Sequence, residues 1–153
     1  MDKTLTLPNY QALAELRYHI RVFFHFSEQA ARRAGLEPRQ YQLMLALKGL
    51  PAHIRPRIGA LAERLQIQHH STVELVNRLA AGGYVKRERA SQDRREVLLS
   101  LTPKGDKVLR ELALVHQAEL SSRGPDLLAA LKRIMKSGKA ASPKKPRNPR
   151  KKT

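Results

Sequence analysis

The stretch that decides the fold is residues 58–105, IGALAERLQIQHHSTVELVNRLAAGGYVKRERASQDRREVLLSLTPKG. Apolar residues recur at helical spacing in two short segments, 58–65 and 69–82, with a brief turn at 66–68 between them. A pair of glycines, 82–83, ends the second segment, as glycine commonly does at the C-terminus of a helix. The first half of this stretch therefore predicts two short helices joined by a turn.

After the glycine pair the hydrophobic period changes from helical to alternating. Two alternating segments, 85–89 and 97–101, flank a polar turn at 90–95, and this pattern predicts a β-hairpin. Thr102 can then cap a further helix, and Pro103 suits its first position because an N–H is not needed there. The expected order is helix, turn, helix, hairpin and helix.

Amphipathic helices are also predicted on both sides of this stretch. Toward the N-terminus, helical spacing favours helices over 9–33 and 38–48. Toward the C-terminus it favours helix over 103–136, interrupted at Gly124 and Pro125, because both residue types break helices. We therefore expect one helix up to about residue 123 and a separate last helix beyond the break.

Residues 137–153 differ in composition from the rest of the chain. They contain seven Lys or Arg, three Pro, no acidic residue and no large apolar side chain. Such a segment cannot bury enough apolar surface to offset the entropy of ordering it. It is predicted to be a disordered basic tail.

The charge and the cysteine count limit the classes of function. The chain has 153 residues, with 30 Lys and Arg against 13 Asp and Glu, a net charge of +17 and a pI near 11.0. This balance favours a polyanionic partner such as nucleic acid. The absence of cysteine excludes disulfides and thiolate metal sites, and no apolar run is long enough to cross a bilayer. We expect a soluble protein of the cytoplasm, associated with the nucleoid, without a membrane partner.

Five short motifs follow one another in the chain: Leu61-Ala62-Glu63-Arg64-Leu65, the helix from Ser71 and Thr72 through Asn77-Arg78-Leu79, Gly83-Tyr84-Val85, Asp93-Arg94-Arg95, and Leu101-Thr102-Pro103-Lys104-Gly105. In this order they resemble the MarR family of bacterial winged helix-turn-helix transcription regulators. The resemblance covers about residues 41–112. It implies a mainly α fold with a small β-hairpin wing, and it implies no enzymatic activity.

The resemblance also implies how the chain is organised. Residues 8–136 would form one MarR-type domain, with the winged helix-turn-helix at about 38–102. The helices at about 9–33 and 103–136 would pair with those of a second copy, which makes the protein a homodimer. Two long amphipathic helices without another obvious docking place fit this role.

The second short helix carries the residues expected to contact DNA bases, because in a helix-turn-helix its N-terminal turn enters the major groove. These residues are Gln68, His69, His70, Ser71, Val73, Glu74, Asn77 and Arg78. Many family members have Arg in place of Glu74 and a hydroxyl residue in place of Val73, so their operator sequences do not transfer. Glu74 either accepts a hydrogen bond from a cytosine amino group or orients a neighbouring His or Arg, and the sequence leaves both open.

The polar turn of the hairpin is the second expected DNA contact, because a basic hairpin tip can enter the electronegative minor groove. Its candidate residues are Arg87, Arg89, Asp93, Arg94 and Arg95. The family resemblance implies that Arg95 lies in the groove and that Asp93 holds the Arg95 side chain. Arg94 is then expected to contact phosphate, and the basic tail to add sequence-independent affinity.

The sequence gives weaker support for two further kinds of site, a metal site and an effector pocket. His70 and Glu74 share a helix face, but their spacing is not that of a metallopeptidase and no third ligand is near, so we expect no metal and no cofactor. Phe23, Tyr41 and Met44 are candidates for lining a pocket for a small aromatic or phenolic effector. Their spacing is also that of a packed core, which is the preferred interpretation.

The function expected from the sequence is sequence-specific transcription regulation. The protein would be a ligand-responsive repressor that binds a pseudo-palindromic operator in double-stranded DNA as a homodimer. One alternative is a nonspecific architectural DNA-binding protein, which the net charge and the tail also permit. Another is a metal- or ligand-binding sensor whose winged helix contacts proteins. No nucleophile, phosphate loop or paired-carboxylate motif supports an enzyme.

Overall fold

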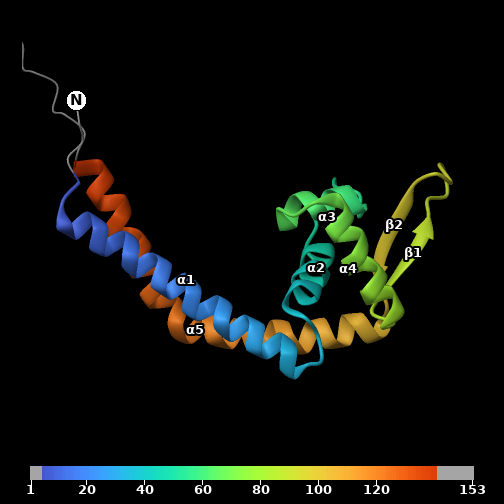
Figure 1. Cartoon of the computed structure of the whole chain (residues 1–153), viewed down its shortest axis with the longest axis horizontal. Helices are drawn as coiled ribbons and strands as arrows, with labels where there is room; N and C mark the ends of the chain where they lie inside the picture. The colour runs from blue at the N-terminus through green and yellow to red at the C-terminus, as the bar shows by residue number, and fades with distance from the viewer. Residues whose placement is uncertain (1–4, 141–153) are drawn as a thin grey trace, which may run out of the picture. The chain divides into compact units, whose positions relative to one another are not determined.

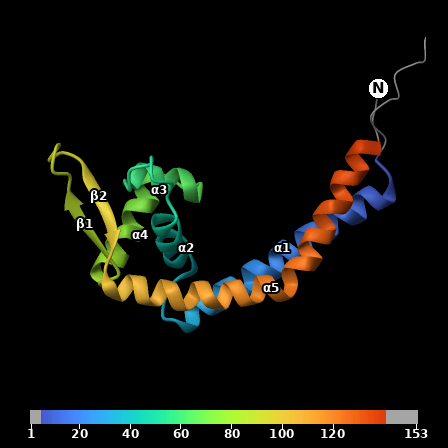
Figure 2. The same cartoon turned by 180° about the vertical axis from the view of Figure 1, so that it is seen from behind.

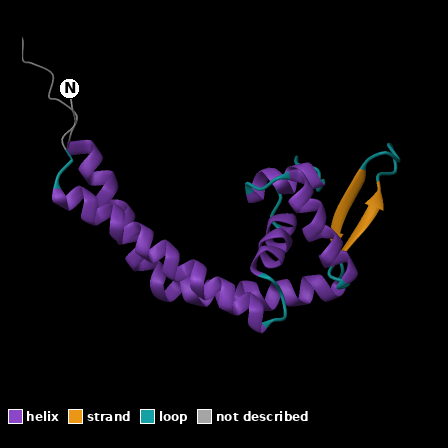
Figure 3. Ribbon diagram, in the orientation of Figure 1, coloured by secondary structure: helices purple, strands orange, loops and turns teal. Residues whose placement is uncertain are grey.

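The computed structural model describes the backbone of residues 5–140 and the side chains of residues 5–136. The helices and strands follow one another as Figures 1 and 3 show: α1 (Leu7–Arg33), α2 (Pro38–Lys48), α3 (Ile58–Leu65), α4 (His69–Ala81), β1 (Val85–Arg89), β2 (Val97–Leu101) and α5 (Pro103–Ala140). The predicted mainly helical fold with a β-hairpin wing is confirmed. The described chain forms two compact units, residues 24–119 and residues 5–23 together with 120–140.

The core of the unit 24–119 lies among α2, α3, α4 and the hairpin. The side chains of Leu43, Met44, Leu61, Val76 and Leu79 are completely buried there. They come from one face of each helix, because residues three or four apart lie on the same side. Burying a side chain of this size contributes roughly 1.5–3 kcal/mol. The apolar stripes seen in the sequence are thus the faces that hold the helix-turn-helix together.

The hairpin is antiparallel, and Val85 and Leu99 turn its inner face into the same core. Val85 pairs with Leu101, and Arg87 pairs with Leu99. The loop before α3 joins the open edge of β2, since the Leu99 N–H donates to the Pro56 carbonyl oxygen over 2.8 Å. The wing is therefore hydrogen-bonded on both sides of β2.

The end of α4 and the start of α5 meet around Tyr84. The Thr102 N–H donates to the Tyr84 carbonyl oxygen over 3.0 Å, and the Thr102 hydroxyl donates to the Gly83 carbonyl over 2.5 Å. The Gly105 N–H donates to the Thr102 hydroxyl over 3.1 Å, so Thr102 caps α5 as predicted. The Lys104 ammonium donates to the Gly82 carbonyl over 2.7 Å and lies 4.4 Å from the centre of the Tyr84 ring. These contacts tie the helix predicted to enter DNA to the long C-terminal helix.

The predicted break in the C-terminal helix is wrong. Pro125 lies inside α5, which runs without interruption from Pro103 to Ala140. A proline removes only one hydrogen bond of the helix ladder. The turns on either side keep theirs, and Ala130, completely buried, belongs to the part of α5 that forms a unit with the start of α1. Propagation of the helix through the turns on either side offsets the local cost of the proline.

The predicted tail is also partly wrong, because α5 continues to Ala140 and includes residues 137–140. The rest of that prediction, residues 141–153, lies outside the described residues. Predicting the tail from composition put its start too early, since a helix that is already formed extends at little cost for each added residue.

In the unit of residues 5–23 and 120–140, the first part of α1 lies beside the last part of α5, and both views agree on this (Figures 1 and 2). Ala12 is 4% exposed and Ala130 is fully buried, as expected where two helix backbones approach closely. Many large apolar side chains of this unit nevertheless face outward. They are Leu5, Leu7, Tyr10, Leu13, Tyr18, Leu120, Leu128, Leu131 and Met135.

Gly105→Ala should destabilise the protein. A Cβ at this position would lie 2.0 Å from the Tyr84 carbonyl oxygen, so either α5 or the turn before β1 must move. Overpacking of this kind costs about 1–3 kcal/mol or more, and we expect the free energy of unfolding to fall by at least about 2 kcal/mol. Chemical denaturation followed by circular dichroism measures the change.

Gly59→Ala is the matched control, because nothing lies within 4 Å of a Cβ there. Gly59 is in α3, and alanine is the better helix former, so this variant should gain roughly 0.5–1 kcal/mol. Equal stability of the two variants would contradict the close packing at Tyr84.

Candidate nucleic-acid interface

The helix α4 presents two different faces. Thr72, Leu75, Val76 and Leu79 are buried in the core, and the Thr72 hydroxyl donates to the Gln68 carbonyl oxygen over 3.1 Å. Gln68 stands at the N-cap, and its side chain makes no capping hydrogen bond. The first N–H groups of α4 thus face outward without a side-chain cap, where the helix dipole favours an anion.

The residues predicted for base contacts lie on the opposite face of α4 or at its edge. Gln68, His69, His70, Glu74, Asn77 and Arg78 are exposed, and Ser71 and Val73 are half-buried. They do not form one set, however. Ser71, Glu74 and Arg78 line a pocket beside α2, whereas the Asn77 side chain accepts a hydrogen bond from Arg87 of the wing. The sequence did not indicate this division, because it depends on which neighbour each side of α4 meets.

The wing is held in shape by its own polar side chains. Arg89 donates from Nη1 to the Arg94 carbonyl oxygen over 2.6 Å, across the turn. The Asp93 carboxylate accepts the backbone N–H of Arg95 over 2.9 Å, which is the contact of an Asx turn. Asp93 therefore fixes the main chain at Arg95, whereas the resemblance had implied a contact with its side chain. The Arg94 and Arg95 side chains are exposed at the tip.

A second set of charges lies at the edge of β2. Glu96 is close to Arg55, at 2.9 Å, and to Arg57, at 3.6 Å, and the Glu96 side chain is only 13% exposed. The sequence shows no helical or alternating pattern in the segment with Arg55 and Arg57. The one available signal was Pro56, which pushes the residue before it into an extended conformation.

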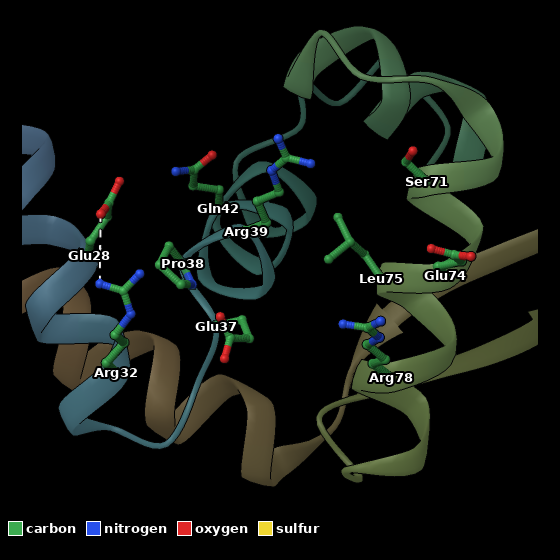
Figure 4. Close-up of a pocket in the computed structure, with 10 residues that line it drawn as sticks. All are labelled: Glu28, Arg32, Glu37, Pro38, Arg39, Gln42, Ser71, Glu74, Leu75 and Arg78. Carbon is green, nitrogen blue, oxygen red and sulfur yellow. Dashed lines mark ion pairs between the residues drawn. The ribbon is translucent and has the colours of Figure 1, made fainter.

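The pocket beside α4 has a volume of about 520 Å³ and a charged lining (Figure 4). Its lining residues are Glu28 and Arg32 from α1, Glu37 next to α2, Pro38, Arg39 and Gln42 from α2, and Ser71, Glu74, Leu75 and Arg78 from α4. Glu28 and Arg32 form an ion pair at 3.7 Å. The lining holds three acidic and three basic residues, and among the described residues neither Arg39 nor Arg78 is in an ion pair.

The residues suggested for an effector pocket are packed differently. Tyr41 is 3% exposed and Met44 is fully buried, both in the main core, while Phe23 belongs to the other unit. The Tyr41 ring stacks on His116, with 4.5 Å between the ring centres. Burial raises the pKa of the Tyr41 hydroxyl. Tyr41 and Met44 thus lie where the core-packing interpretation expects them.

The buried His116 side chain makes polar contacts inside this core. Its Nε2 lies 2.8 Å from the Ser27 hydroxyl, and its Nδ1 lies 2.6 Å from the Leu112 carbonyl oxygen. Both ring nitrogens of this buried side chain are therefore satisfied. Elsewhere in the described residues, no three His, Asp or Glu side chains gather as a metal site would require.

Residues 34–96 match the family model described as MarR family. This segment holds α2, α3, α4 and β1, so the helix-turn-helix with its wing is of the MarR type. A putative transcriptional regulatory protein for the hcr operon of Thauera aromatica is 29% identical, with 78% of each chain covered. A MarR-family regulator is a DNA-binding transcriptional regulator with a winged helix-turn-helix, and it is not an enzyme.

Solved structures of transcription regulators have a similar fold. AbsC, a MarR family transcriptional regulator from Streptomyces coelicolor, matches with a TM-score of 0.69 and 24% identity, covering 91% of this chain and 93% of AbsC. The transcriptional repressor CouR, bound to a 23-mer DNA duplex, matches with a TM-score of 0.61 and 25% identity, covering 80% of this chain and 87% of CouR. In residues 5–140 no helix is both long and apolar enough to cross a membrane.

Asp93→Ala should weaken DNA binding by loosening the wing tip. The variant loses the acceptor of the Arg95 N–H, an exposed hydrogen bond whose net worth is about 0.5–1.5 kcal/mol. We expect affinity for DNA to fall about two- to tenfold and the Arg95 amide to exchange faster with solvent. Ser91→Ala, in the same turn, is the control, and equal effects of the two substitutions would contradict the role of the Asx turn.

Proposed function

We propose that this MarR regulator is a homodimeric repressor that binds a pseudo-palindromic operator in the cytoplasm and is released by a small anionic ligand. The observation that carries the proposal is the polar, uncapped start of α4 beside a basic wing whose tip is fixed by Asp93. The first turn of α4 would enter the major groove, with Gln68 to Glu74 meeting base edges. Arg95 would enter the adjoining minor groove, and Arg94 would contact phosphate.

The apolar surface of the unit 5–23 and 120–140 supports a dimer. Leu7, Tyr10 and Tyr18 of α1 and Leu128 and Met135 of α5 are each at least half exposed. A surface of this kind on a monomer indicates an interface. A second copy has the same surface, and a two-fold axis would bring two α4 helices to half-sites about 34 Å apart on one side of DNA. The domain of residues 8–136 would then consist of a DNA-binding part and this dimerisation part.

The pocket beside α4 supports a response to ligand. Arg39 and Arg78 can bind a carboxylate, and Leu75 and Pro38 offer apolar contact to an aromatic ring. Glu74 and Arg78 belong both to this pocket and to the face expected to contact DNA. An anionic ligand that binds Arg78 competes with DNA for that side chain, so binding of the two should be antagonistic.

Arg95→Ala should lower operator affinity roughly 5- to 150-fold, the effect expected for losing one groove contact. Fluorescence anisotropy with operator and random duplexes measures it, and analytical ultracentrifugation checks that the dimer persists. Arg110→Ala, an exposed basic residue of α5, is the control. Operator and random DNA bound equally by the wild type would instead favour the architectural alternative, and full activity of Arg95→Ala would favour a protein-contacting sensor.

Arg39→Ala should leave operator binding unchanged but weaken the response to benzoate and hydroxybenzoates by about 12- to 160-fold. The variant removes one charge-assisted contact, worth about 1.5–3 kcal/mol, from the pocket and none from the DNA-facing side of α4. Calorimetry with benzoate and operator release by anisotropy provide the two measurements. An unchanged benzoate response in Arg39→Ala would show that this pocket is not the effector site.

A further inference from the structure

The two guanidinium groups at the edge of the wing share a single carboxylate. Arg55 lies 2.9 Å and Arg57 lies 3.6 Å from oxygens of Glu96. The Glu96 side chain is 13% exposed, whereas those of Arg55 and Arg57 are 52% and 60% exposed. One arginine is enough to neutralise Glu96, so this cluster keeps one net positive charge and most of its N–H donors on the surface.

The backbone fixes where this cluster lies. Pro56 accepts the hydrogen bond from the Leu99 N–H, which joins the loop to the edge of β2 as an additional extended segment. Glu96 immediately precedes β2 and follows Arg94 and Arg95 of the tip. The Glu96 N–H donates to the Asp93 carbonyl oxygen over 3.0 Å, so Glu96 is also part of the turn. Arg55 and Arg57 therefore extend the basic surface of the wing onto a second stretch of chain.

We propose that Arg55 and Arg57 form a phosphate-binding contact to the DNA backbone beside the wing, with Glu96 as the residue that positions them. The proposal rests on the operator binding proposed above. Planar guanidinium groups suit phosphate oxygens, and holding both against one carboxylate lowers the entropy lost when they bind. The contact adds affinity and fixes the angle of the wing, and it carries no base preference.

The competing interpretation is that the three side chains only hold the wing to the loop. In that case losing either the arginines or the carboxylate should have the same consequence. In the proposed contact only the two arginines touch DNA, whereas the negative charge of Glu96 repels the DNA backbone. The two interpretations therefore predict different relative effects of R55A/R57A and E96Q on DNA affinity.

The experiment measures operator affinity from 50 to 200 mM salt for the wild type, R55A/R57A, E96Q and the control R110A. Loss of two phosphate contacts should lower the slope of log affinity against log salt by about 1.8. The wild type then loses about 12-fold more affinity than R55A/R57A over this range. The drop in affinity at low salt should be equal for operator and random DNA. E96Q and R110A should keep the wild-type slope.

Two results would overturn the proposal: an unchanged slope in R55A/R57A, or equal losses of affinity in R55A/R57A and E96Q. If R55A/R57A does not fold, R55Q/R57Q provides the same test, because glutamine still donates to Glu96 but carries no charge. Absence of operator binding by the wild type is a separate outcome, which refutes the proposed function before the variants are compared.

Discussion

Burial of one face of α4 is the constraint on which the rest of the structure depends. Leu75, Val76 and Leu79 can reach the core only if the opposite face of the same helix points to solvent. The polar residues on that outer face are thereby directed away from the core. The junction at Tyr84 and Gly105 then joins α4 to the start of α5.

The wing is attached to the rest of its unit at several points. A two-stranded hairpin alone is marginally stable in water. Here Leu99 packs into the core, Asn77 accepts a hydrogen bond from Arg87, and Glu96 holds the loop at Pro56. A basic tip that is already ordered loses less entropy when it enters a groove. The charges of the wing therefore act from a fixed position.

Much of this arrangement could be predicted from local pattern. The predicted helix at 69–82 is observed at 69–81, and the alternating segments 85–89 and 97–101 form the two strands as expected. Local pattern failed at Pro125, where a strong helix-breaking signal lies inside a continuous helix. The turns on either side propagate that helix despite the proline. Local pattern also set the start of the tail too early, since α5 continues to Ala140.

The sequence by itself predicted the helix-turn-helix with its wing and the polar outer face of the second helix, because these follow from short-range periodicity and charge. Five short motifs carried the resemblance to the family. Only the tertiary structure decided which charges meet. Arg39 and Arg78 line one pocket although 39 positions separate them, and Glu96 holds Arg55 from 41 positions away. Such contacts arise from the packing of whole elements, and sequence spacing carries no record of them.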